Sequence, residues 1–90
     1  METLIQEFSD YLRIEKRNSP NTILAYRSDL IRFSSELSGK PLESVTTANI
    51  RGFLISLRSQ GMSASSIARN LSSIKSFFKY LCQDKQLKNN

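Results

Sequence analysis

Two short serine-rich segments carry side chains whose types and spacing suit the binding of a phosphate group. They are Ser19-Pro20-Asn21-Thr22 and Ser63-Ala64-Ser65-Ser66. Each places hydroxyl groups at the predicted start of a helix, where the first backbone N–H groups have no helical partner and the helix dipole is positive. Ordinary N-capping, which stabilises a helix by about 1 kcal/mol, requires the same residues. The segments are therefore consistent with either a two-pronged phosphate grip or plain caps.

Basic side chains accompany both segments. Lys16, Arg17 and Arg27 surround the first segment, and Arg69 lies one turn into the second. Cationic side chains beside a helix start add charge attraction to the phosphate site that the backbone offers.

The fourth predicted helix also offers a combination of side chains that is able to contact bases. Arg69, Asn70 and Ser73 occupy neighbouring positions between its apolar stripe and its opposite face. Arginine pairs with guanine O6 and N7, and asparagine pairs with adenine, so these residues are candidates for contacts in the major groove. A plain solvated helix face explains the same residues equally well.

Several kinds of catalytic and metal chemistry are excluded by composition. The 90 residues contain no histidine and one cysteine, Cys82. A Cys/His zinc site, a Ser-His-Asp triad and a Cys-His dyad are therefore impossible, and we expect no metal, no cofactor and no catalysis by this chain. The tyrosines Tyr11, Tyr26 and Tyr80 lack the cationic clamps and general acid that a tyrosine nucleophile needs, so we expect them to pack.

The formal net charge of +5 is unevenly distributed. Residues 1–15 carry four acids against Arg13, a net charge of −3, whereas residues 16–90 carry a net charge of +8. A basic surface of this kind suits a polyanionic partner, because neutralised phosphates release counterions. The chain has no apolar run of membrane-spanning length and no signal-peptide layout at its N-terminus, so we expect no membrane partner and a cytoplasmic location.

Apolar periodicity and capping residues predict four helices and no strand. The expected helices span about 2–15, 20–38, 48–60 and 64–84, with Thr47 as the cap of the third. Each has one apolar stripe; that of the fourth helix, for example, comprises Ile67, Leu71, Ile74, Phe78 and Leu81. Together the stripes predict an all-α, compact four-helix bundle joined by short connections.

Two longer motifs add a family resemblance. Residues 19–30 (SPNTILAYRSDL) and residues 61–81 (GMSASSIARNLSSIKSFFKYL) closely resemble the signatures of the N-terminal, core-binding domain of tyrosine recombinases, the phage-integrase and Xer family. The resemblance covers essentially the whole chain. It implies a SAM-like bundle that binds double-stranded DNA at a recombination half-site, with the second and fourth helices facing the DNA.

Carried over residue by residue, the resemblance implies a set of DNA-binding residues from the two motifs and their flanks. This set is Lys16, Arg17, Ser19, Asn21, Thr22, Arg27, Ser63, Ser65, Ser66, Arg69, Asn70 and Ser73. Ser66 stands where the family usually has threonine, a change that keeps the hydroxyl group.

The resemblance also implies a domain organisation. We expect residues 1–86 to form the core-binding domain and residues 87–90 to begin an interdomain linker, the chain being a fragment whose catalytic domain is absent. Its implied partners are DNA, that catalytic domain and other recombinase protomers. The alternative is a small helical protein–protein interaction module with an incidental basic face.

Overall fold

The chain is all-α, as the sequence predicts, in a computed structural model that describes residues 1–84. Its helices are α1 (Glu2–Ile14), α2 (Pro20–Leu37), α3 (Thr47–Ser59) and α4 (Ala64–Asp84), with a 3₁₀ turn, η1, at Leu42–Ser44. The predicted boundaries of α4 are correct, and those of the other three helices differ by one residue at one or both ends. The predicted domain end at 86 and the linker at 87–90 lie outside the described residues.

Local sequence signals set most of the helix ends. Ser19 caps α2 and Pro20 occupies its first turn, where a missing N–H costs nothing. The left-handed residues Ser38 (φ 51°) and Gly39 (φ 83°) end α2. The prediction of Thr47 as the cap of α3 is wrong: Thr46 caps it, because its hydroxyl group accepts from the Asn49 amide while the Asn49 side chain accepts from the Thr46 amide.

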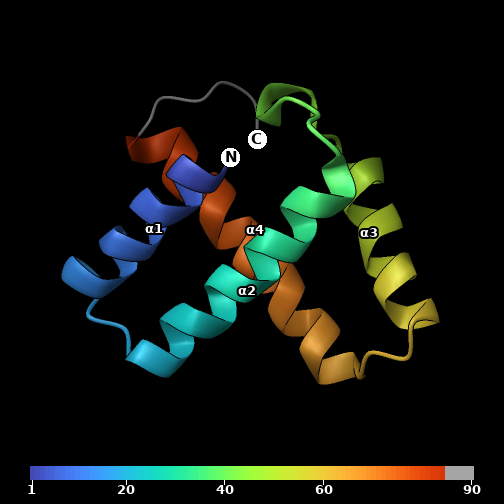
Figure 1. Cartoon of the computed structure of the whole chain (residues 1–90), viewed down its shortest axis with the longest axis horizontal. Helices are drawn as coiled ribbons and strands as arrows, with labels where there is room; N and C mark the ends of the chain where they lie inside the picture. Colours follow the sequence, from blue (N-terminus) through green and yellow to red (C-terminus); the bar gives the residue numbers. More distant parts are fainter. Residues whose placement is uncertain (85–90) are drawn as a thin grey trace.

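Helices α2 and α4 cross at the centre of the molecule, with α1 on one flank and α3 on the other (Figure 1). The α1–α2 connection and the α3–α4 connection both lie at the lower edge in this view, so α2 and α4 start at the same edge. The molecule is flat, with extents of 35 × 29 × 17 Å.

Aromatic side chains from all four helices build the core. Phe8 of α1 packs against Phe77 and Tyr80 of α4, with ring centroids 5.4 and 5.3 Å apart. Phe33 of α2 meets Phe53 of α3 edge to face at 5.2 Å. These rings are buried, so they supply much of the apolar surface that the fold removes from water.

The buried face of α4 is rotated slightly from the predicted stripe. Ile74, Phe78 and Leu81 are buried as expected, but Leu71 is only half-buried. Asn70, Ser73 and Phe77 are fully buried instead. In the N-terminal half of α4, the polar side chains of Asn70 and Ser73 therefore face α2. No helix among residues 1–84 is both long and apolar enough to cross a membrane.

Candidate nucleic-acid interface

The start of α2 is a capped helix end with an open backbone amide. The Ser19 hydroxyl group accepts from the Thr22 amide at 3.2 Å and donates to the Thr22 hydroxyl group at 3.0 Å. The Ile23 amide bonds to the Ser19 carbonyl group, and Pro20 has no N–H. Within residues 1–84 no acceptor is recorded for the Asn21 amide, and the Asn21 side chain is exposed. This amide is available to an anion.

The start of α4 repeats this arrangement. The Ser63 hydroxyl group accepts from the Ser66 amide at 3.3 Å and lies 3.1 Å from the Ser66 hydroxyl group. The Ile67 amide bonds to the Ser63 carbonyl group, which leaves the amides of Ala64 and Ser65 without a recorded acceptor in the described part of the chain. Both serines, Ser63 and Ser65, are exposed. Capping and anion binding are thus compatible here, because the cap uses only one of the first-turn amides.

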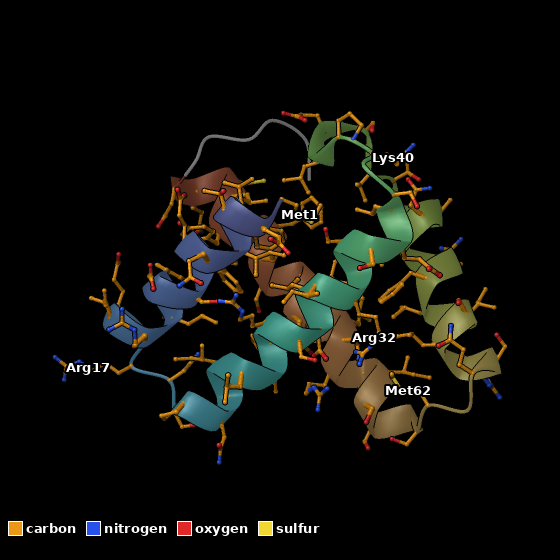
Figure 2. The ribbon with its side chains drawn as sticks, in the orientation of Figure 1. Met1, Arg17, Arg32, Lys40 and Met62 are labelled. Carbon is orange, nitrogen blue, oxygen red and sulfur yellow. The ribbon has the colours of Figure 1, made fainter. Side chains whose placement is uncertain are left out.

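Cationic side chains lie beside the α2 start. Lys16 and Arg17 are exposed in the α1–α2 connection, and Arg17 extends into solvent at the lower left of Figure 2. Arg17 has a φ of 53°, so the chain turns sharply at this residue. Arg27 is directed differently: its guanidinium donates to the Gln6 side chain of α1, and the residue is half-buried.

A buried carboxylate, Asp29 of α2, joins the two crossing helices. It has no exposed surface and accepts two hydrogen bonds from Arg69 of α4, from Nε at 2.9 Å and from Nη2 at 2.7 Å. The Ser73 hydroxyl group donates to the same carboxylate at 2.8 Å. The hydrogen bond to Asp29 raises the pKa of Arg69, so this guanidinium stays charged.

Arg32 completes this cluster. Its Nη1 lies 3.5 Å from an Asp29 carboxylate oxygen and donates to the Asn70 side-chain carbonyl at 3.4 Å. Arg32 lies near the crossing of α2 and α4 (Figure 2). We call Asp29, Arg32, Arg69, Asn70 and Ser73 the crossing cluster.

The expectation that Asn70 and Ser73 contact bases disagrees with this geometry. Both side chains are fully buried. The Asn70 amide donates to the Ser66 carbonyl group at 2.8 Å, and the Ser73 hydroxyl group is bonded to Asp29 and to the Arg69 carbonyl group. Side chains with these internal partners hold the helices together. Of the three candidate base-contacting residues, Arg69 alone is exposed, with 44% of its side-chain surface accessible.

Sequence reasoning missed Asp29 as the partner of Arg69 and Arg32 as a second cation beside Asp29. The signal was present for Asp29: it lies three residues after Tyr26 and four before Phe33, and so falls on the apolar stripe of α2. A charged residue on such a stripe predicts a buried ion pair.

A second surface feature is an apolar hollow of about 520 Å³ between α3 and α4. Its lining includes Leu54, Ile55, Met62 and Ile67, with Arg51 and Arg58 also contributing. Ile55 is 62% exposed.

The chain is thus a small helical domain in which α2 and α4 start at the same edge, with polar side chains at both starts and cationic side chains beside that of α2. The model of the phage integrase N-terminal SAM-like domain matches residues 5–85, so the chain belongs to this family. It is the N-terminal domain type of tyrosine recombinases, distinct from their catalytic domain.

Curated relatives agree with this assignment. The chain is 39% identical over 84 residues to tyrosine recombinase XerC of Oceanobacillus iheyensis and 41% identical over 88 residues to tyrosine recombinase XerD of Listeria monocytogenes. These alignments cover 90% and 93% of the chain but only 28% and 30% of the relatives, so the chain spans less than a third of their length. No solved structure matches the chain significantly.

Proposed function

We propose that this chain is the DNA-binding part of a site-specific tyrosine recombinase or integrase, and that it grips the backbone of a half-site through the starts of α2 and α4. The observation that carries the proposal is the pair of capped helix starts on one edge, with open amides at Asn21, Ala64 and Ser65. Exposed Lys16 and Arg17 add positive charge beside the first of them.

The proposed contacts differ from the set that the family resemblance implies. Lys16, Arg17, Ser19, Asn21, Thr22, Ser63, Ser65 and Ser66 hold phosphates, and Arg69 faces a groove. Arg27, Asn70 and Ser73 support this surface through their bonds to Gln6, Ser66 and Asp29. Strand cleavage belongs to a separate catalytic domain, which is a proposed partner together with other protomers on the DNA.

The test is an amide chemical-shift titration of the labelled chain with a short duplex at about 50 and 200 mM salt. We expect the largest shifts at residues 16–24 and 63–69, with binding that weakens steeply at the higher salt concentration because phosphate contacts release counterions. An absence of shifts, or shifts confined to residues 1–15, would contradict the proposal.

The apolar hollow between α3 and α4 favours a second candidate function, a protein-interaction module. An exposed isoleucine in an apolar hollow is a typical feature of a docking surface. The amides around Ile55 separate the two functions, because a duplex bound at the helix starts leaves them unshifted, whereas a protein partner bound in the hollow shifts them.

A further inference from the structure

We propose that Asp29 is a positioning residue for DNA recognition, holding Arg69 so that its outer edge pairs with one guanine in the major groove. This inference rests on the proposed function and deepens it, because it separates the reading of one base pair from the general grip on phosphates.

The stereochemistry of the guanidinium group is the first step. Arginine carries five N–H donors in one plane. Asp29 takes the pair formed by Nε and Nη2, which is the side edge of the plane. Among residues 1–84, no recorded bond uses Nη1 of Arg69. The end edge, formed by Nη1 and the second hydrogen of Nη2, therefore stays available, and this edge matches O6 and N7 of guanine.

The rigidity of the support is the second step. Asp29 has no exposed surface, and Ser73 donates a further hydrogen bond to the oxygen that receives Nε of Arg69. Arg32 lies on the other carboxylate oxygen. The carboxylate is thus held from both helices, whereas 44% of the Arg69 side chain is open to solvent. A guanidinium fixed in this way loses less conformational freedom when it pairs with a base.

The location of the cluster is the third step. Arg69 lies in the first third of α4 and Asp29 lies near the middle of α2, and the starts of these two helices share one edge. Arg69 therefore lies beside the proposed phosphate contacts at the helix starts. In the proposed complex it reaches the major groove between these contacts.

The charge of Asp29 makes the inference testable. A buried carboxylate next to DNA disfavours binding to any polyanion, so Asp29→Asn removes a repulsive charge while it destroys the two-point hold on Arg69. If Asp29 positions Arg69, affinity for random duplex stays constant or rises, whereas discrimination for one G·C pair falls. A merely structural role predicts that both affinities fall in parallel with the folded fraction.

The experiment begins by selecting preferred duplexes from a randomised library with the unaltered chain. Affinities are then measured for a selected duplex, for copies with each G·C pair replaced by A·T, and for random duplex, each corrected for the folded fraction from circular dichroism. We expect the unaltered chain to discriminate at one G·C pair by about 5-fold to 150-fold, the range for a bidentate contact. Asp29→Asn and Arg69→Ala should each abolish this discrimination, and combining them should cause no further loss.

Two control variants sharpen the result. Asp10→Asn breaks the Asp10–Arg13 ion pair, an exposed pair on α1 at 3.4 Å, and should leave discrimination unchanged. Ser73→Ala perturbs the buried cluster without removing either bond between Asp29 and Arg69, and should retain most of the discrimination.

The outcomes distinguish the two proposals. Unchanged discrimination in Asp29→Asn, or an equal loss in Ser73→Ala, overturns the positioning role. Binding of the unaltered chain without preference at any G·C pair overturns it as well but leaves the proposed function intact. Failure to bind any duplex overturns both.

Discussion

Arg69 stabilises the folded state and also makes the proposed DNA contact. In the fold it neutralises Asp29, the buried carboxylate of the crossing cluster. Its two bonds to Asp29 join α2 to α4 through residues that are 40 positions apart in the chain. Removing one partner of a buried pair leaves the other charge poorly compensated. Stability and the proposed DNA recognition therefore depend on the same side chain.

Arg69→Met should lower the free energy of unfolding by about 2–3 kcal/mol, because Asp29 then stays buried with only Ser73 and Arg32 as partners. Asp29 raises the pKa of Arg69 above its already high ordinary value. The stabilisation that the charged guanidinium provides is therefore complete below the ordinary pKa, and it is lost only as the pH rises through the raised pKa. Urea unfolding at pH 7 and pH 10 should therefore give the same loss. Arg13→Met, at an exposed pair, should change stability by less than about 0.5 kcal/mol.

Lys16→Ala should weaken binding to all duplexes alike and reduce the slope of log affinity against log salt by about one unit, because Lys16 contacts a phosphate in the proposed complex. Fluorescence anisotropy over a salt series measures this slope. Lys40→Ala is the matched control: Lys40 is also exposed but lies at the opposite edge of the molecule (Figure 2). An equal change in slope for both variants would contradict the proposal that DNA binds at the edge where α2 and α4 start.

At the scale of the helices, two exposed glycines differ in whether their backbone conformation requires glycine. Gly61 has a φ of 90° and lies between α3 and α4, where it sets the direction in which α4 starts. Gly52 lies inside α3, and a Cβ atom added there would meet no other atom within 4 Å. The chain direction before α4 thus depends on a conformation that other residues adopt only with strain.

Gly61→Ala should therefore destabilise the fold by about 1–2 kcal/mol, because a side chain at this positive φ is strained. Gly52→Ala should stabilise it by about 0.5–1 kcal/mol, since alanine is the better helix former. Thermal unfolding of the two variants measures both effects. Changes of the same sign would show that the Gly61 conformation does not matter for α4.

At the scale of the whole molecule, the core is a single hydrophobic cluster of aliphatic and aromatic side chains in a flat domain. Phe77 is fully buried and contacts Phe8 of α1 and Phe78 on its own helix. Phe33 and Phe53 connect α2 to α3 in the same core. A chain of 90 residues buries only one modest core, so each of these rings carries a large share of the stability.

Phe77→Ala should cost about 3–5 kcal/mol, the range for truncating a buried phenylalanine, against a total stability of about 5–10 kcal/mol. Calorimetry should show a lowered melting temperature and partial unfolding near body temperature. Ile55→Ala removes an exposed apolar side chain and should leave the melting temperature nearly unchanged. A small effect for Phe77→Ala would mean that the α1–α4 contact is dispensable.

The sequence by itself determined the local features of this protein. Apolar periodicity, Ser19-Pro20, Gly61 and Ser63 predict the helices to within one residue, because capping and backbone preference act over a few neighbouring positions. The two motifs also identify the family, which the match over residues 5–85 confirms.

Tertiary structure alone decided which polar residues at the border of the α4 stripe face inward and which partner Asp29 takes. A rotation of α4 by a fraction of a turn buries Asn70 and Ser73 in place of Leu71, and only the crossing of α2 over α4 brings Asp29 to Arg69. Periodicity does not specify this, because a residue at the border of an apolar stripe is buried or exposed according to the helix that packs against it.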